Sequence, residues 1–443
     1  MLYELERAVK DKNITKGFKN YQQQLLNLKT FMGPEKKDFT GNINYIKARE
    51  ILVKSILPKK TKLRKLDLEN ENDVERAFSN KKASAGAVAP GKQKHEVMDI
   101  IVDTAKWMLE NPEAPGIPAL CFERSQISNF IVDGKIDSTN IKHKTRLVWC
   151  IDAATVLVEA MFARPLMDET FKSVKQYAGG KPDEDISLEL RKWNKYFWLC
   201  LDFSQFDGTI PSWLIKDMFT ILKQYFDMKH WWILDWICDK FINTTIIMPD
   251  GKVYQKHKGI PSGSYFTQII GSMCNMQMIL TYMYSLHGEK IHEEMNMFDK
   301  RLSRNKKYYC FMVMGDDNIV FTRTKINKKH LSTYMSHNFG VKVHPDKCDE
   351  GNHNSDPVFL KRRWTRDGAK RDLLEFLVQA VHPERRRDYD TYSEWHILYG
   401  YFLTYSGTMK DFITREAIER GMKESGGSEI LLRMDRTLLP GAL

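Results

Sequence analysis

The chain has 443 residues, enough for one large multi-lobed unit or for two to three domains, and its 42% hydrophobic content is ordinary for a globular protein. A formal net charge of +11 favours an acidic partner such as nucleic acid, although charge bears on association and not on fold. No run reaches the roughly 18 apolar residues of a membrane-spanning helix, and the acidic first residues lack the core of a signal peptide.

The seven cysteines are scattered, and no two of them form a Cys-x-x-Cys pair. We expect them to be reduced core residues of an intracellular protein and not a disulfide framework. His344, Cys348 and His353 have a spacing that zinc tolerates. Because no fourth ligand is evident, a polar loop is the preferred interpretation of this segment.

Residues 1–80 are polar and are predicted to be helical, and the run at 54–65 within them carries bases and no acids. That basic run either contacts phosphates or forms a solvated face. Residues 83–92 form a loop of small side chains ahead of a predicted helix at 94–111. Small side chains let one backbone approach another closely.

Lys142, Lys144 and Arg146 alternate along a segment that leads into a predicted strand, and a helix rich in Ala and Val follows at 153–162. A period of two places the three cations on one face of the strand. Such a row suits a triphosphate, since arginine gives a bidentate grip and lysine a point charge. An edge strand protected against aggregation would show the same pattern.

A second apolar strand is predicted at 196–201; it ends in Asp202, and Asp207 follows five residues later. A carboxylate at the end of a buried strand needs a partner. Residues 212–247 are predicted to be helical, with aromatic side chains that belong mostly to the core. Residues 259–268 form a Gly- and Ser-rich loop before an apolar helix at 269–286, an arrangement that presents backbone N–H groups to an anion or a sugar phosphate.

Residues 308–321 indicate a β-hairpin with strands that are at least half buried, because apolar runs flank the turn-type residues 315–318. Two adjacent carboxylates at a rigid tip cost free energy unless a cation lies there, and the usual cation is a divalent metal. Asp and Asn also favour tight turns without any ligand. If the strand at 196–201 lies beside the hairpin, Asp202 and Asp316 can share two ions roughly 3.5–4 Å apart, and Mg²⁺ suits because it takes few carboxylates.

Beyond the hairpin, an amphipathic helix is predicted at about 328–338. A Gly-led strand and loop follow at 340–347, and a short strand pair follows at 358–364. The remainder, 367–443, is predicted to be helical, with aromatic side chains spaced along 395–405.

Three of these stretches, in this order, resemble motifs A, B and C of viral RNA-dependent RNA polymerases: Asp202-x4-Asp207, Ser262-Gly263-x3-Thr267 and Gly315-Asp316-Asp317. The resemblance is strongest to the polymerases of partitiviruses, with the related picobirnaviruses next. Four flanking stretches are similar to motifs G, F, D and E, respectively 84–86, 142–149, 340–347 and 358–364. The resemblance covers roughly residues 80–365.

The resemblance implies an α+β fold, the right-hand polymerase with fingers, palm and thumb, in which helices flank an antiparallel palm sheet. Residues 1–189 would form an N-terminal extension and the fingers. Residues 190–366 would form the palm, with a fingers insertion near 225–260, and residues 367–443 would form a small helical thumb.

The resemblance also implies the reaction, which is transfer of nucleoside monophosphates from rNTPs to an RNA 3′-hydroxyl. Asp202, Asp316 and Asp317 would be catalytic and would bind two Mg²⁺ ions, for which Mn²⁺ can substitute, and Lys347 would be the general acid for pyrophosphate. The alternative for Lys347 is a surface lysine. Substrate binding would fall to Lys142, Lys144, Arg146, Asp207, Ser262, Gly263, Thr267 and Asn275. RNA binding would fall to Ser84, Ala85, Gly86, Lys361 and Arg362.

Ribose recognition is left with two alternatives. In picornavirus-like relatives an Asn four residues after the motif B Thr completes the contact to the 2′-hydroxyl, but Gly271 stands there in this chain. Asn275 lies one helical turn further on, on the same face. Either Asn275 reaches back to Asp207, or Ser262 and Thr267 read the sugar and Asn275 is a buried polar residue of the helix.

The partners implied by the resemblance are RNA template and product, rNTPs and a viral capsid protein, with no membrane. The implied setting is the virion interior or the host cytoplasm of a double-stranded RNA virus. Three other readings are a reverse transcriptase, an inactive RNA-binding protein and an unrelated metal-dependent hydrolase. A reverse transcriptase usually has a bulky aromatic where this chain has Asp207, inactive relatives tend to lose a carboxylate, and a hydrolase would not require the basic strand or the motif order.

Overall fold

The computed structural model describes residues 14–16, 21–57, 62–125, 127–129, 131–132, 135–136, 145–193, 195–288, 309–366, 368–370 and 420. The predicted helical thumb at 367–443 lies almost wholly outside the described residues, and so do Lys142 and Lys144.

A four-stranded antiparallel sheet lies at the centre of the described fold, in the order β11–β12–β7–β14. Its strands are β7 (Phe197–Leu199), β11 (Tyr309–Met314), β12 (Asp317–Thr322) and β14 (Glu350–Gly351). The predicted hairpin is confirmed, since β11 and β12 pair up to Met314 and Asp317 across a two-residue turn. β7 pairs with β12 with Leu199 opposite Val320, so the hairpin and the Asp202 strand are neighbours.

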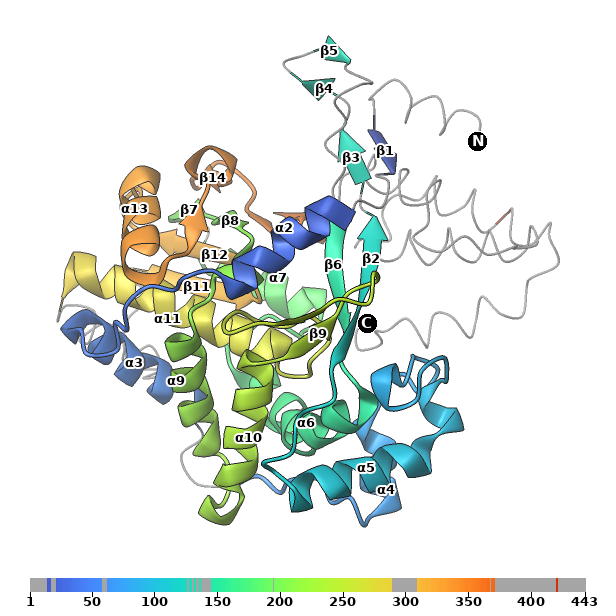
Figure 1. Ribbon diagram of the computed structural model, residues 1–443. Helices are drawn as coiled ribbons and strands as arrows, with labels where there is room; N and C mark the ends of the chain where they lie inside the picture. Colours follow the sequence, from blue (N-terminus) through green and yellow to red (C-terminus); the bar gives the residue numbers. More distant parts are fainter. Residues whose placement is uncertain are drawn as a thin grey trace.

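Both faces of this sheet are covered. Successive side chains along β7, β11 and β12 alternate between a large apolar core and a smaller apolar cluster. The large core includes α11 (Thr267–His287), which packs against β11, and the smaller cluster includes α7 (Asp183–Arg191). Burial on both faces explains why the strands are near-continuous apolar runs in the sequence. Figure 1 shows α11 passing along the lower side of the sheet in this view.

A second sheet has the order β10–β9–β2–β6, with a parallel pair between β2 and β9 and antiparallel pairs elsewhere. Its strands are β2 (Ala119–Ser125), β6 (Thr145–Cys150), β9 (Thr245–Ile247) and β10 (Val253–Gln255). Figure 1 shows β2 and β6 upright on the right of the molecule. The prediction of helix throughout 212–247 is wrong at its end, where β-branched Thr245, Ile246 and Ile247 favour a strand.

Helices surround these sheets. Those predicted from the sequence are α5 (Met98–Glu110), α6 (Ala153–Pro165), α9 (Ser212–Lys223), α10 (Trp231–Ile242) and α13 (Lys328–Phe339). The N-terminal part contains α2 (Tyr21–Met32), α3 (Ile43–Ile56) and α4 (Glu71–Ala77), together with one strand, β1 (Ile14–Lys16), where helix was predicted. β1 pairs with β3 (Ile127–Asn129), a distant partner that local sequence does not reveal.

Several shorter strands lie among these elements. β8 (Phe203–Ser204) pairs with β13 (Lys342–Val343), and β15 (Val358–Phe359), β16 (Arg362–Thr365) and β17 (Gly368–Lys370) form a third sheet. α13 ends where Gly340 takes a φ of +74°, a left-handed conformation that glycine adopts without strain. Among the residues described here, no helix has the length and apolar character that crossing a membrane requires.

Candidate active site

The three aspartates singled out by the sequence lie at one edge of the central sheet. Asp202 follows the end of β7, Asp316 lies in the two-residue turn of the β11–β12 hairpin, and Asp317 is the first residue of β12. Because Leu199 is opposite Val320, the same register continued past the end of β7 sets Asp202 across from Asp317. Residues directly opposite on neighbouring strands project to the same face of a sheet. The fold therefore brings the ends that carry these carboxylates together.

Asn318 joins these two ends. Its Oδ1 accepts a hydrogen bond from the backbone N–H of Leu201 at 3.1 Å, and its Nδ2 donates to the backbone oxygen of Asp316 at 3.0 Å. The Asn318 side chain is buried, where a polar group is stable only when it is hydrogen-bonded. One side chain thus fixes the residue before Asp202 relative to Asp316.

The carboxylates remain accessible, since Asp316 is exposed and Asp202 and Asp317 are half-buried. Their oxygen donors have the chemistry that Mg²⁺ requires. Within the described ranges, no group of three or more His, Cys, Asp or Glu side chains is close enough to hold a metal ion by itself. The set fits Mg²⁺ in the mode in which one or two carboxylates bind and water and substrate phosphates complete the coordination.

His344, Cys348 and His353, whose spacing would tolerate zinc, likewise form no metal-binding group within the described residues. The Cys348 sulfur instead donates to the carbonyl oxygen of His344 at 3.2 Å and accepts from the N–H of Asp202 at 3.4 Å. Burial raises the pKa of the Cys348 thiol, which favours the neutral S–H form that these contacts use.

The segment that carries Lys347 is attached directly to Asp202. The N–H of His344 donates to the backbone oxygen of Asp202 at 2.9 Å, next to the β8–β13 pair. Lys347 follows in a single 3₁₀ turn, in which its own N–H donates to the carbonyl of His344 at 3.1 Å. Its side chain is exposed, as a residue that meets a substrate must be.

Asp207 lies in the short helix α8 (Phe206–Thr209) and its side chain is exposed. Its backbone oxygen accepts from the N–H of Ile260 at 2.8 Å, so motif A is bonded to the start of the motif B loop. Helix α2 packs against α8, and a Cβ added at Gly208 in α8 would lie 2.1 Å from Oγ1 of Thr30 in α2. No pattern in the sequence indicates this contact between the N-terminal helix and motif A.

The motif B loop packs on β6. A Cβ added at Gly263, whose φ is +99°, would lie 2.6 Å from the carbonyl oxygen of Trp149, and Ser262 Oγ accepts from the N–H of Trp149 at 3.4 Å. Thr267 Oγ1 donates to the carbonyl of Pro261 at 2.6 Å and closes the loop. These contacts place Ser262 and Gly263 beside the strand in which Arg146 lies opposite Arg124.

Glu159 is a residue of this site that sequence reasoning missed. It is fully buried in α6, where it accepts from Ser264 Oγ at 2.8 Å and from the N–H of Tyr265 at 2.9 Å. Burial raises the pKa of the Glu159 carboxyl from 4.5 to about 8, against the opposing effect of these two hydrogen bonds. The available signal was one acid in the middle of an otherwise apolar helix.

Asn275 is fully buried in α11 and does not contact Asp207. Its Nδ2 donates to the backbone oxygens of Gly315 at 3.0 Å and Asp316 at 3.2 Å. Asn275 is therefore a buried polar residue of the helix, as one of the two sequence-based alternatives expects, and its amide hydrogens are bonded to the Gly315–Asp316 turn. Which residue reads the ribose stays a prediction. Ser272, also fully buried and not anticipated, accepts from the N–H of Gly315 at 2.8 Å.

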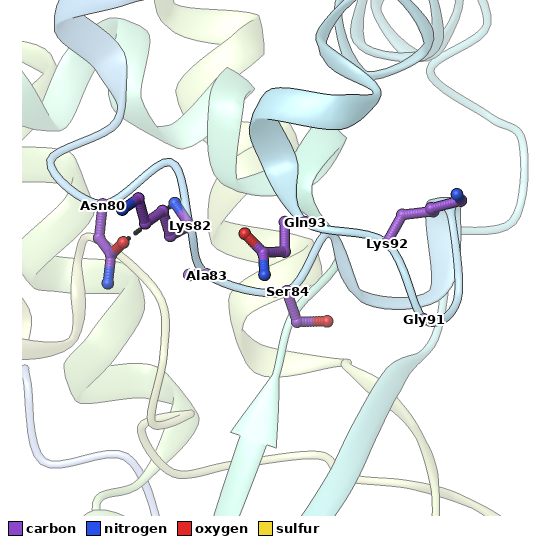
Figure 2. Close-up of a pocket in the computed structure, with 7 residues that line it drawn as sticks. All are labelled: Asn80, Lys82, Ala83, Ser84, Gly91, Lys92 and Gln93. Carbon is purple, nitrogen blue, oxygen red and sulfur yellow. Dashed lines mark hydrogen bonds between the residues drawn. The ribbon is translucent and has the colours of Figure 1, made fainter. Parts of the chain in front are cut away.

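The predicted template-binding loop is held on the start of α6. The carbonyl of Ala85 accepts from the N–H of Ala153 at 2.9 Å, and a Cβ on Gly86, whose φ is +76°, would lie 2.8 Å from Asp152 Cα. Ser84 is exposed and pairs with Gln93 in an isolated antiparallel bridge. Figure 2 shows the two on neighbouring segments of an open pocket of about 630 Å³, lined by Asn80, Lys82, Ala83, Ser84, Gly91, Lys92 and Gln93.

The two predicted RNA contacts of motif E differ from each other. Lys361 is exposed in the β15–β16 turn, where Leu360 and Lys361 both have positive φ, 54° and 56°. The guanidinium of Arg362 is instead largely buried and forms an ion pair with Asp183 at the start of α7. Contact with RNA through Arg362 would require breaking that pair, so the structure favours Lys361 over Arg362.

Comparisons with known proteins identify the family to which the chain belongs. The family model described as viral RNA-dependent RNA polymerase matches residues 130–413. The RNA-directed RNA polymerase of Cryptosporidium parvum virus 1 (strain KSU-1) is 34% identical over 141 residues, which are 30% of this chain and 27% of that protein. The RNA-directed RNA polymerase of White clover cryptic virus 1 (isolate Boccardo/2004) is 27% identical over 168 residues, 36% of this chain and 24% of that protein. The matched segments therefore span about a quarter of these relatives.

Among solved structures, the RNA-dependent RNA polymerase of a human picobirnavirus superposes with a TM-score of 0.67 at 14% identity. The alignment covers 100% of this chain and 82% of that one. This likeness confirms the predicted fold class, the α+β right-hand polymerase.

Proposed function

Because the chain belongs to the viral RNA-dependent RNA polymerase family, we propose that it copies an RNA template by transferring nucleoside monophosphates from rNTPs to an RNA 3′-hydroxyl. The observation that carries the proposal is the sheet edge that presents Asp202 on one strand end and Asp316 and Asp317 on the neighbouring hairpin, with Asn318 bonded to both sides. Its genome would be double-stranded RNA, and its setting the virion interior or the host cytoplasm with a capsid protein as partner. Residues 1–189, 190–366 and 367–443 would act as fingers, palm and thumb.

Asp202, Asp316 and Asp317 would hold two Mg²⁺ ions, or Mn²⁺ in their place. When bound, the ions lower the pKa of the attacking hydroxyl and neutralise charge on the phosphates. The protein's part is to present these carboxylates at a fixed spacing. Accessible carboxylates on two hydrogen-bonded strand ends support that role.

The incoming nucleotide would lie on the surface formed where the motif B loop meets β6. Arg146, with Lys142 and Lys144, would bind the triphosphate, and Ser262, Gly263 and Thr267 would position the sugar and its phosphate. The exposed Lys347 would hold a proton on Nζ and give it to the departing pyrophosphate. Its attachment to Asp202 through His344 supports this assignment.

The template would enter past Ser84, Ala85 and Gly86. Lys82 and Lys92 line the same pocket and offer cations to the sugar–phosphate backbone, while base pairing supplies the sequence information (Figure 2). Lys361 would contact the product strand. Contacts to the backbone alone are sufficient for an enzyme that copies any sequence.

A test of substrate class compares rNTP with dNTP incorporation on RNA and DNA primer–templates. The proposal predicts incorporation of rNTPs on RNA, and a chain that preferred dNTPs would be a reverse transcriptase.

Asp207 accepts a hydrogen bond that only a 2′-hydroxyl can donate. Asp207→Ala should therefore lower the rNTP-to-dNTP ratio by about one to two decades. An unchanged ratio would remove Asp207 from ribose selection.

A further inference from the structure

The Gly315–Asp316 turn, which carries one of the proposed catalytic carboxylates, is hydrogen-bonded to α11 through both backbone polar groups of Gly315. Its N–H donates to Ser272 Oγ at 2.8 Å, and its carbonyl accepts from Asn275 Nδ2 at 3.0 Å. The same Nδ2 donates to the carbonyl of Asp316 at 3.2 Å, which also accepts from Asn318 Nδ2 at 3.0 Å. The backbone on both sides of the Asp316 carboxylate is thus fixed by buried side chains.

The sequence and position of α11 favour this contact with the turn. Ser272 and Asn275 are three residues apart, a spacing that places them on one helix face. A Cβ added at the preceding residue, Gly271, would lie 3.5 Å from Gly315 Cα, so the helix passes in close contact with the turn. Ser272 and Asn275 are both 0% exposed. Hairpin tips are ordinarily solvated, whereas this one is bonded to a core helix.

Only one end of the Asn275 amide is hydrogen-bonded. Its Oδ1 is buried and has no hydrogen-bond partner within the described part of the chain. A buried polar atom without a partner costs free energy, so the contribution of this side chain comes from the Nδ2 hydrogen bonds to the turn. The side-chain amide of Asn275 lies where its Nδ2 donates to two backbone carbonyls of the turn, those of Gly315 and Asp316.

We propose that Ser272 and Asn275 are positioning residues for Asp316. By holding the Gly315–Asp316 backbone they fix the direction of the Asp316 carboxylate, and they set the rate of nucleotide transfer without touching the nucleotide. Gly315 has a φ of +64° and no side chain, so the turn has little stiffness of its own. An error of about 1 Å in a reacting group can cost 10²-fold in rate. The inference rests on the proposed function and assigns Asn275 a role other than ribose recognition.

The test compares Ser272→Ala and Asn275→Ala with Thr281→Val. Thr281 is a matched control, because it is fully buried in the same helix and its hydroxyl donates to the carbonyl of Gln277, away from the turn. We expect kcat for rNTP incorporation to fall about 10-fold or more in each of the first two variants, with KM within about twofold. Thr281→Val should keep the wild-type kcat.

A second readout does not depend on activity. Hydrogen exchange at the Gly315 amide should be faster in Ser272→Ala and unchanged in Thr281→Val. Ser272→Ala removes one oxygen atom, so it carries the test even if Asn275→Ala does not fold. Wild-type kcat in Ser272→Ala, with the Gly315 amide exchanging faster, would overturn the proposal.

The ratio of rNTP to dNTP incorporation tests separately whether Asn275 recognises the ribose. We expect Asn275→Ala to slow rNTP and dNTP incorporation equally, and a fall in the rNTP-to-dNTP ratio would mean that Asn275 reads the sugar and that the proposal is wrong. An inactive wild-type chain would instead contradict the proposed function. The present inference fails when the wild type is active and either the variants are equally active or Asn275→Ala lowers that ratio.

Discussion

Single side chains do much of the positioning at this site through bonds to distant backbone groups. Asn318 is bonded to a residue 117 positions away, and Ser272 to one 43 positions away. Asp202, Asp316 and Asp317 could be found from the sequence, because they end apolar strands or interrupt an apolar hairpin. Ser272 and Asn318 could not, because a buried polar residue has meaning only once its partner is known.

Glu159 leads to a prediction about pH. Its pKa is about 8 in the folded protein and 4.5 as its ordinary value, so between these the folded state binds one proton more than the unfolded state. The free energy of unfolding therefore falls as pH rises through this window, by up to about 1.4 kcal/mol per pH unit from this group. Above the folded pKa both states are ionised, and the loss stays constant.

Glu159→Gln removes this titration and keeps one acceptor oxygen for the N–H of Tyr265, while its Nε2 can donate to Ser264 Oγ. Relative to wild type, the variant should gain about 2 kcal/mol in free energy of unfolding between pH 6 and pH 8. Urea unfolding of both proteins at the two pH values measures the gain. Parallel pH profiles would show that Glu159 is not the titrating group.

Lys347 allows a kinetic prediction at the same scale. If its Nζ protonates pyrophosphate, Lys347→Leu should slow pre-steady-state single-nucleotide incorporation by about 10²–10⁴-fold, and the pH–rate profile should lose one ionisation. Lys342→Leu, an exposed lysine of the adjoining strand β13, is the matched control and should keep the wild-type rate. An unchanged rate in Lys347→Leu would leave it a surface lysine.

At the scale of elements, periodicity and apolar runs predicted α5, α6, α11, α13 and the β11–β12 hairpin within a few residues of their bounds. Prediction failed at β1, because pairing with the distant β3 decides that segment. It failed at β9 because the β-branched residues that favour a strand there were assigned to the preceding helix. The packing of α2 on motif A could not be predicted either, since nothing in the polar N-terminal sequence indicates which segment it contacts.

The close contact between the motif B loop and β6 gives an element-scale prediction. Gly263→Ala places a Cβ 2.6 Å from the carbonyl of Trp149 at a φ of +99°, so the loop must move off β6. Gly251→Ala is the control, because its φ is +80° and a Cβ there meets nothing within 4 Å. Both substitutions incur backbone strain of order 1–3 kcal/mol.

Gly263→Ala should destabilise the protein by about 1–2 kcal/mol more than Gly251→Ala in urea unfolding, because it adds a clash to the strain. It should also raise KM for rNTPs, while Gly251→Ala leaves KM unchanged. Equal destabilisation and equal KM in the two variants would mean that the loop does not need its contact with Trp149.

For the whole molecule, the order of the motifs along the chain predicted the right-hand fold, which the picobirnavirus structure shares at only 14% identity. The arrangement follows from a few long-range contacts around the sheet: β7 beside the hairpin, α11 beneath the turn and the motif B loop on β6. Composition and charge could suggest a nucleic-acid partner, but only the folded chain shows which carboxylates share an edge.

The most direct test of the account is Asp316→Asn, measured for both rNTP incorporation and RNA binding beside Asp103→Asn, which removes an exposed carboxylate of α5. Asp316→Asn should lower incorporation by about 100-fold or more and leave RNA affinity within about twofold, because a carboxylate does not bind phosphate. Asp103→Asn should match the wild type in both measurements. Near wild-type incorporation by Asp316→Asn would contradict the assignment of this sheet edge as the catalytic centre.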